Sequence, residues 1–382
     1  MPIRPVSLAL KGVVSASMVA VMLAGCAKDK VTTPATGGPD AKALAATPAS
    51  ELGFQARHGD EIMICGRYYR IGAPVVLWTD PGGYDAYRVE RRFSPYDQSS
   101  WTATTQAMAA GKVKFESKDQ EFAPLRYGMR YGADPTTQFS AEEIETIRGG
   151  GWPLPLLQRK VDQFVLHFDV AGVSRSCFNT LQDHRGLSVQ FMLDIDGTIY
   201  QTLDVKERAW QATKSNNRSI GIEIANMGAY GVNQSASPLV QWYEKQPDGR
   251  AMITIPERLK GGGVRTPGPF YSRRNEPVVG VIQGSKLKQY DFTPQQYDSL
   301  IKLTAALCDA LPEIKPDAPR GPDGKVTTDA LSDAEWEKYK GILGHYHVQT
   351  NKNDPGPAFD WDYFIPAVQE RVKQLKAARK VD

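Results

Sequence analysis

Two histidines and one aspartate are the residues of this 382-residue chain whose chemistry best suits a bound metal ion. His167 lies in the apolar run QFVLHF, His345 follows Gly344, and Asp354 opens the run DPGP. Two imidazoles and one carboxylate form a ligand set of catalytic zinc, which keeps a fourth position for water and lowers the pKa of that water to about 7. Spacing alone leaves a second interpretation open, because a lone histidine in an apolar strand is more often a hydrogen-bonded core residue.

Another histidine offers an alternative ligand. His347 lies two residues after His345, and residues two apart share one face of a strand, so it competes with His345 for the same role. His184 lies near Gly186 in a predicted turn, where a surface or cleft position is expected rather than a metal ligand.

Short apolar strands are predicted to position these residues after about residue 160. The run over 163–168 is typical of a buried strand. Residues 188–203 form two strand-like runs joined through Asp196-Gly197, a hairpin signal, and the apolar run SIGIEIA covers 219–225. Because helices alternate with these strands, the pattern favours an α/β fold with a mixed central β-sheet flanked by helices.

Three capping boxes predict where helices begin. Each is a serine or threonine followed three residues later by glutamate or glutamine. They begin at Ser140, Thr293 and Ser332. The predicted helices end near residues 148, 311 and 343, and a further basic helix is expected from about Tyr363.

Residues 1–25 have the features of a secretory signal peptide, with Arg4 and Lys11 flanking an uncharged start and a short apolar run after them. That run is shorter than the roughly 20 residues that span a bilayer. Its ending, Leu-Ala-Gly before Cys26, resembles a bacterial lipobox, which implies cleavage before Cys26 and lipid attachment to it. A soluble secreted protein is the alternative. In a Gram-negative cell, Ala27 would favour the periplasmic face of the outer membrane.

The rest of the chain divides into a tether and a folded part. Residues 26–50 lack aromatics and are rich in Ala, Thr, Pro, Gly and charge, so a flexible tether is expected. Residues 51–150 are expected to form a β-rich N-terminal extension, whose aromatics are more typical of strand packing than of carbohydrate stacking. Residues 151–382 then hold the α/β domain. Its long insertion at about 229–290 carries much Gly, Pro and charge and is of the kind that is functional or mobile.

Charge and cysteine content exclude two kinds of protein or site. The chain has 46 basic and 43 acidic residues, which is too even for a nucleic-acid binder that works by charge alone. Cys65, Cys177 and Cys308 are too far apart for a zinc site made of cysteines alone. In an oxidising compartment they permit one disulfide, whose pairing the sequence leaves open.

Six features of the folded part stand out together. They are VLHF, FMLDIDGTIYQ, Ala-Trp at 209–210, Asn217, SIGIEIAN and GHYHVQTNKNDPGPAFDW. In this combination and order they resemble the zinc-dependent N-acetylmuramoyl-L-alanine amidases of the amidase-2 family, whose relatives include peptidoglycan recognition proteins and phage lysozyme-type amidases. The resemblance covers about residues 160–226 and 292–364, and it implies that 151–382 is a zinc amidase domain.

The resemblance assigns three metal ligands. By position, the zinc ligands of the family fall on His167, His345 and Asp354. The Gly-His pattern of the family selects His345 over His347. Aspartate rather than cysteine as the third ligand is similar to the bacterial branch.

Two catalytic residues follow from the same resemblance. The catalytic acid at the end of SIGIE falls on Glu223, and the lysine two residues before the metal-binding aspartate falls on Lys352. A carboxylate beside the metal can take a proton from water and deliver it to the departing nitrogen. A nearby ammonium group can stabilise the oxyanion of the tetrahedral intermediate.

Four further residues are implied to border the substrate cleft, namely Trp210, Gln190, Gln211 and Asn217. Many relatives have histidine where Gln190 and Gln211 stand. Glutamine hydrogen-bonds sugar or peptide but does not titrate, so a shifted substrate preference is expected.

The implied function is hydrolysis of the amide between the lactyl group of N-acetylmuramic acid and L-alanine of the stem peptide. Its implied cofactor is Zn²⁺, its partners are peptidoglycan or muropeptides, and its only membrane contact is the lipid anchor, with no nucleic-acid partner. Two alternatives remain: a non-catalytic peptidoglycan-binding module, and a zinc amidase that acts on another acyl-amide.

Overall fold

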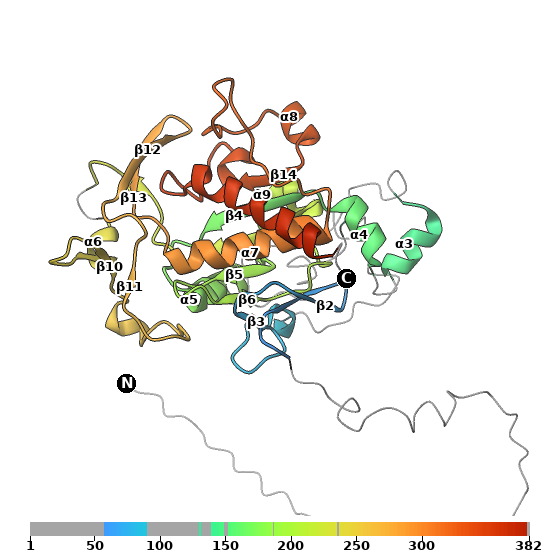
Figure 1. The fold of residues 1–382 in the computed structure, drawn as a ribbon, viewed down its shortest axis with the longest axis horizontal. Coiled ribbons are helices and arrows are strands. Elements are labelled where there is room, and N and C mark those ends of the chain that lie inside the picture. The colour runs from blue at the N-terminus through green and yellow to red at the C-terminus, as the bar shows by residue number, and fades with distance from the viewer. Residues whose placement is uncertain are drawn as a thin grey trace, which may run out of the picture. The chain divides into compact units, whose positions relative to one another are not determined.

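A six-stranded sheet forms the centre of the part of the chain that the structure describes (Figure 1). This computed structural model describes residues 57–89, 130, 139–148, 152–185, 187–234 and 237–379, within one compact unit, Arg57–Asp382. The predicted signal peptide, the predicted tether and Cys26 lie outside the described residues. In sheet order, the strands are β14 (Gly341–Gly344), β4 (Gln163–Phe168), β7 (Ser219–Ile224), β5 (Phe191–Leu193), β6 (Ile199–Gln201) and β3 (Val75–Leu77).

Strand direction gives this sheet one edge at which several strands end. β14, β4, β7 and β5 run parallel, so their carboxyl ends meet there. β5 and β6 form the antiparallel hairpin predicted around Asp196-Gly197, and β3 pairs in parallel with β6. The predicted α/β fold with a mixed central sheet is therefore confirmed.

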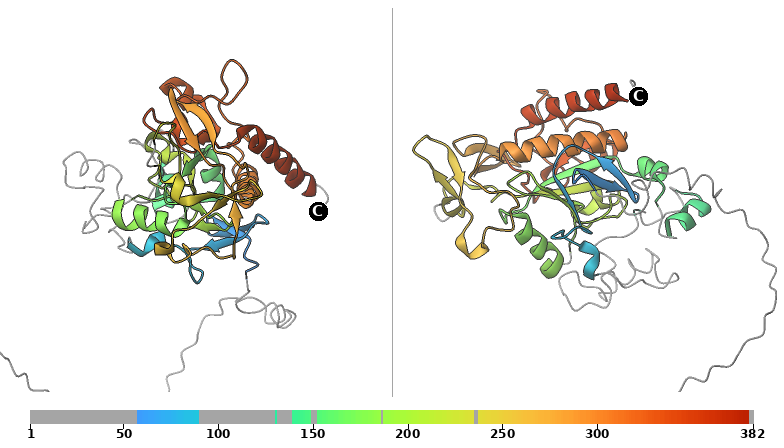
Figure 2. Two further views of the ribbon diagram at one scale, coloured as in Figure 1. Left: turned by 90° about the vertical axis from the view of Figure 1, so that its left-hand side faces the viewer. Right: turned by 60° about the horizontal axis from the view of Figure 1, so that its bottom comes forward.

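Helices cover both faces of the sheet. The two long helices, α7 (Pro294–Ala310) and α9 (Trp361–Ala378), pack together and share one apolar core with alternate residues of β4, β7 and β5. The short helix α5 (Ser174–Phe178) packs with Met192 and Tyr200 on the opposite side. Figure 2 shows the long helices on one side of the sheet and α5 on the other.

This two-sided packing decides which face the candidate catalytic residues occupy. Leu166 and Ile222 point into the core beneath α7 and α9. Since successive strand residues point to opposite faces, His167 and Glu223 point to the face that carries α5. Met192 is the register partner of Glu223 and packs with α5, which agrees with that direction.

The three predicted capping boxes are present, but one predicted helix was too long. The boxes open α3 (Ala141–Arg148), α7 and α8 (Asp333–Lys338). The third helix was expected over 332–343, yet it ends at Lys338 and residues 341–344 form β14. Parallel pairing with β4 buries Ile342 and Leu343 completely, and this burial outweighs continuation of the helix.

The described portion of the predicted N-terminal extension belongs to the same fold. β1 (Glu61–Ile64) and β2 (Arg67–Arg70) form a hairpin, and β3 is the edge strand of the central sheet. A 3₁₀ turn at Ala86–Val89 and the helix α3 are the helical elements described in this extension, and the helix α4 (Leu154–Lys160) follows it. Residues 51–56, 90–129, 131–138 and 149–150 of this predicted extension lie outside the described residues.

The insertion at 229–290 has regular structure. One small sheet contains β8 (Tyr230–Gly231), β13 (Ser285–Gln289) and β12 (Val278–Ile282). A second contains β9 (Tyr243–Lys245), β10 (Ala251–Ile253) and β11 (Phe270–Tyr271), next to the short helix α6 (Leu239–Trp242). In Figure 1 the hairpin β12–β13 stands beside the elements that follow β14.

The described part of the chain contains three cysteines. Cys65, Cys177 and Cys308 are free thiols there. Within the same residues, no helix combines the length and the apolar character that crossing a bilayer requires.

Candidate active site

The two candidate histidines are brought together by neighbouring parallel strands. His167 is the last but one residue of β4, and His345 directly follows β14, whose last residue Gly344 pairs with Leu166. Asp354 lies nine residues further on, in the loop after the 3₁₀ turn His345–His347. All three side chains are buried at the carboxyl edge of the sheet, where open α/β sheets bind their ligands.

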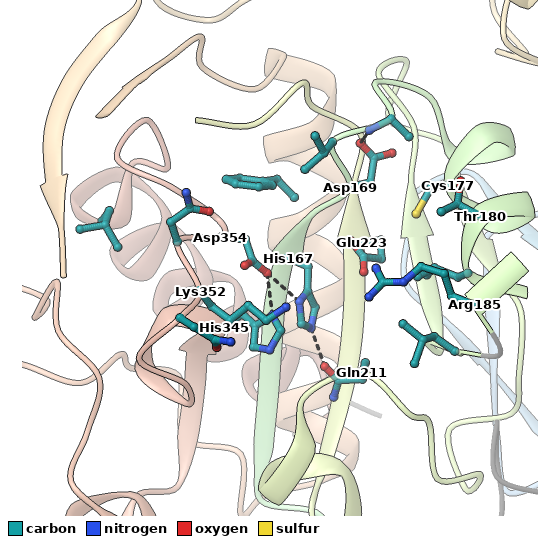
Figure 3. Close-up of a pocket in the computed structure, with 18 of the residues that line it drawn as sticks. His167, Asp169, Cys177, Thr180, Arg185, Gln211, Glu223, His345, Lys352 and Asp354 are labelled. Carbon is teal, nitrogen blue, oxygen red and sulfur yellow. Dashed lines mark hydrogen bonds and ion pairs between the residues drawn. The ribbon is translucent and has the colours of Figure 1, made fainter. Parts of the chain in front are cut away.

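Their potential ligand atoms converge on one point. Nδ1 of His167 is 2.8 Å from Oδ2 of Asp354, and Nδ1 of His345 is 2.9 Å from the same oxygen (Figure 3). The three ligand atoms lie within 4.8 Å of one another. The residues proposed from the sequence as a ligand set therefore meet in space.

Two glutamines fix the orientation of the imidazoles. Nε2 of His167 donates to Oε1 of Gln211 at 2.5 Å, and Nε2 of His345 donates to Oε1 of Gln349 at 2.7 Å. Because an amide oxygen only accepts, each Nε2 carries a proton, and Nδ1 is the atom left to bind a metal. Second hydrogen bonds of this kind are usual for metal-binding histidines, so the donor set fits zinc.

The environment of Asp354 favours a charged ligand. Burial alone would raise the pKa of this carboxyl group, but the neighbouring His345 and His167 hold it well below its ordinary value. Asp354 is therefore ionised over the range in which proteins work, as a carboxylate ligand must be.

Glu223 stands beside His167 on the next strand. The two residues are register partners across the parallel pair β4–β7, so their side chains project from adjacent positions on one face. Glu223 is half-buried, and desolvation raises its pKa to about 8, partly offset by His167. A carboxyl group with a pKa near neutrality can both accept and return a proton.

Lys352 lies in the loop between His345 and Asp354 and lines the same pocket as Glu223. Figure 3 shows both side chains around the two histidines. The cavity has a volume of about 720 Å³. Its wall also includes apolar residues from several elements, namely Val170, Leu181, Leu187, Ile282 and Leu287. A pocket of this size with a few convergent polar groups suits a small-molecule ligand or part of a larger one.

The four residues predicted to border the cleft fall into two groups. Trp210 and Gln211 line the pocket. Gln190 is fully buried, where its Nε2 donates to the carbonyl of Glu207 and its Oε1 accepts from the backbone N–H of Gly221. Oδ1 of Asn217 accepts from Arg208. Gln190 and Asn217 therefore hold neighbouring chain in place and lie outside the pocket lining.

The competing histidines are placed elsewhere. His347 is buried, its Nδ1 accepts from the backbone N–H of Gly344, and its Nε2 donates to the carbonyl of Thr327. Desolvation lowers its pKa to about 4, so it is a neutral structural residue with both nitrogens occupied. His184 is exposed on a π-helical turn, Asn179–Arg185.

Several residues of the site were not predicted from the sequence. Gln349 orients His345, and the hairpin β12–β13 lines the pocket with Ile282, Gln283, Ser285 and Leu287. The only signal for Gln349 was its position four residues after His345. The hairpin lies in the insertion, for which the sequence pattern indicated no specific contact.

Solved structures similar to this chain include three amidases of low sequence identity. The N-acetylmuramyl-L-alanine amidase AmiD from E. coli, solved with anhydro-N-acetylmuramic acid-L-Ala-D-gamma-Glu-L-Lys, is 19% identical over 55% of this chain and 57% of its own, with a TM-score of 0.31. AmpD is 18% identical over 55% of this chain and 86% of its own, with a TM-score of 0.27. The endolysin amidase LysCS from Clostridium intestinale is 14% identical over 56% and 86%, with a TM-score of 0.29.

The structural match to AmiD spans little more than half of that protein, and no curated protein matches the chain. A family model, by contrast, identifies the family. The model of the family described as N-acetylmuramoyl-L-alanine amidase matches residues 157–357, which is more than half of the chain and includes the three potential ligands, Glu223 and Lys352. The chain therefore belongs to the N-acetylmuramoyl-L-alanine amidase family.

Proposed function

We propose that the chain hydrolyses the amide bond between the lactyl group of N-acetylmuramic acid and L-alanine of the peptidoglycan stem peptide. The observation that carries the proposal is the meeting of His167, His345 and Asp354 in one pocket with Glu223 and Lys352, in a chain of the amidase family. The three residues would hold a zinc ion, which supplies a Lewis acid that polarises the amide carbonyl and lowers the pKa of water.

Glu223 is the proposed proton shuttle. The attacking water forms a bond to the carbonyl carbon and gives a proton to the Glu223 carboxylate. The bond between that carbon and the alanine nitrogen then breaks, and Glu223 returns the proton to the leaving amine. Its raised pKa, about 8, suits the second step, because a group of low pKa is a poor proton donor at neutral pH.

Lys352 and the two glutamines complete the proposed machinery. The Lys352 ammonium would stabilise the negative charge that develops on the carbonyl oxygen. Attraction between opposite charges is stronger in a pocket from which water is partly excluded. Gln211 and Gln349 keep Nδ1 of each imidazole available through the hydrogen bonds to Nε2. Trp210 also lines the pocket and is a further residue proposed to contact the substrate.

The proposal is tested by incubating the purified full-length chain with isolated peptidoglycan sacculi, with zinc and with a chelator. Zinc-dependent release of stem peptides is expected from the unmodified chain and not from His167→Ala or Glu223→Gln. Sacculi that are bound but never cleaved would favour the non-catalytic binding module. Absence of both binding and release would favour an amidase of another acyl-amide.

We also propose that the chain is an exported lipoprotein that acts in the cell envelope. The support is the lipobox-like sequence that ends at Cys26 and the tether-like composition of residues 26–50. Expression in a Gram-negative host with radiolabelled palmitate is expected to label the unmodified chain. Equal labelling of Cys26→Ser would refute the assignment.

A further inference from the structure

The tip of the hairpin β12–β13 is fixed against the loop that carries two of the potential metal ligands. Ile282 pairs with Ser285, so the turn has only two residues, Gln283 and Gly284. Both have positive φ values, 47° and 73°, as tight two-residue hairpin turns require. The backbone N–H of Gln283 donates to the carbonyl of Thr328 at 3.0 Å, which ties the tip down.

One atom of this tip contacts three backbone carbonyls of the ligand loop. Nε2 of Gln283 is 2.8 Å from the carbonyl oxygen of Tyr346, 2.7 Å from that of Gln349 and 3.0 Å from that of Lys352. Tyr346 follows the ligand His345, Gln349 orients His345, and Lys352 precedes the ligand Asp354 by two residues. A single side chain thus contacts the backbone of this loop at three positions between His345 and Asp354.

The other end of the same hairpin supports the residues that follow Asp354. Gln289 is fully buried, its Nε2 donates to the carbonyl of Pro355 at 3.1 Å, and its Oε1 accepts from the N–H of Ala358 at 3.0 Å. Gly356, with φ of 86°, passes so close to Gln289 that a Cβ there would lie 2.1 Å from Oε1. Ile282 and Leu287 also pack on Tyr346 between these two points.

From these contacts we propose that Gln283 is a positioning residue of the metal site, and that the hairpin β12–β13 is a built-in brace for the loop that carries His345 and Asp354. The inference rests on the proposed function, because it concerns the same zinc site. Gln283 does not contact the ligands themselves. It acts through the backbone, because three carbonyl oxygens that converge without a donor repel one another and would separate.

The chemistry of the contact predicts how substitutions rank. Gln283→Met keeps a similar length but removes the donor, so zinc affinity is expected to fall about tenfold, in the range seen when outer contacts of metal ligands are lost. Gln283→Glu places a carboxylate among three carbonyl oxygens and is expected to lose more. Gln283→Lys supplies three N–H donors on one nitrogen and is expected to retain affinity within about threefold of the unmodified chain.

The test measures the zinc dissociation constant of the full-length chain by competition with a chromophoric chelator, after circular dichroism has confirmed folding. Lys286→Met is the matched control, because Lys286 is exposed on the same hairpin. Weakened zinc binding by Gln283→Met and Gln283→Glu, with affinity retained by Gln283→Lys, supports the brace. If Gln283→Glu fails to fold, the comparison is between Gln283→Met and Gln283→Lys. Unchanged affinity in Gln283→Met, or an affinity of Gln283→Lys as low as that of Gln283→Met, overturns the proposal. An unmodified chain that binds no zinc overturns the proposed function instead.

Discussion

The strand half and the loop half of the active site are positioned in different ways. On the strand half, His167 and Glu223 are register partners held by the hydrogen-bonded ladder between β4 and β7. On the loop half, His345, Lys352 and Asp354 follow β14 in a segment that has no ladder of its own. The sheet therefore fixes one ligand and the proton shuttle. The other two ligands depend on hydrogen bonds within their own loop and on side-chain contacts from the hairpin β12–β13.

The two orienting glutamines repeat this difference. Gln211 lies over Gly221 of β7, where a Cβ would come within 2.6 Å of its side chain, and its Nε2 donates to Oγ of Ser219 at 2.8 Å. Among the described residues, the side chain of Gln349 hydrogen-bonds to His345 and, at 3.5 Å, to Asn351. Rigid strands hold one imidazole through a packed contact, and the loop holds the other through a local one.

The largest expected effect concerns the strand half. Glu223→Gln keeps the size of the side chain but removes the carboxyl group that accepts and returns the proton. Turnover of muropeptide is therefore expected to fall about 10²–10⁴-fold. Zinc affinity should stay within a few-fold of the unmodified chain, since Glu223 is not among the three converging ligands. Turnover is measured by chromatography of released peptide. Unaltered turnover would remove the shuttle role.

On the loop half, the loss of Lys352 is expected to slow the reaction somewhat less than the loss of Glu223. Lys352→Met removes the cation proposed to stabilise the oxyanion, and kcat is expected to fall about 10²–10³-fold with a smaller change in KM. The control is Lys286→Met, which lies outside the pocket lining. A change in KM alone would instead indicate that Lys352 binds the substrate equally well in the ground state and in the transition state.

The orienting glutamines give a direct comparison of the two halves. Gln211→Leu and Gln349→Leu each remove the acceptor for one Nε2–H, and each is expected to weaken zinc binding about tenfold. Gln211→Glu keeps an acceptor oxygen and should bind zinc at least as tightly as the unmodified chain. Isothermal titration measures all three, and equal affinity in both leucine variants and the unmodified chain would contradict the orienting role.

The smallest expected effect is on the way in which the free energy of unfolding depends on pH. The pKa of Glu223 is about 8 in the folded chain against an ordinary value of 4.5, so the folded state holds its proton more firmly. The resulting stability is fully present below about pH 4.5 and is lost as pH rises toward 8. Metal-free Glu223→Gln lacks this loss, so its unfolding free energy should exceed that of the unmodified chain increasingly from pH 5 to pH 8.5, by a few kcal/mol at most. Urea unfolding measures the difference, and a constant difference across this range would contradict the raised pKa.

Much of the strand half could be predicted from the sequence. The runs around His167 and Glu223 are short, apolar and β-like, and they coincide with β4 and β7. Capping boxes also marked the starts of three helices, because the box is a local contact between residues three apart. Local patterns suffice where local contacts decide the structure.

The loop half was less predictable, because its contacts join distant parts of the chain. Gln283 is 63 to 69 residues before the carbonyls it contacts, and no periodicity encodes such pairing. The predicted helix over 332–343 included residues 341–343, which belong instead to β14 because that strand pairs with β4, far earlier in the sequence. That strand determines where His345 stands.

Both halves of the active site meet in the proposed zinc site, whose proposed reaction is the cleavage of an amide. Mass spectrometry of a purified muropeptide, treated with the full-length chain carrying one zinc ion, tests it most directly. We expect a free stem peptide with an L-alanine amino terminus beside an intact sugar fragment, and no reaction after chelation. An uncleaved muropeptide in the presence of the zinc-loaded chain would contradict it.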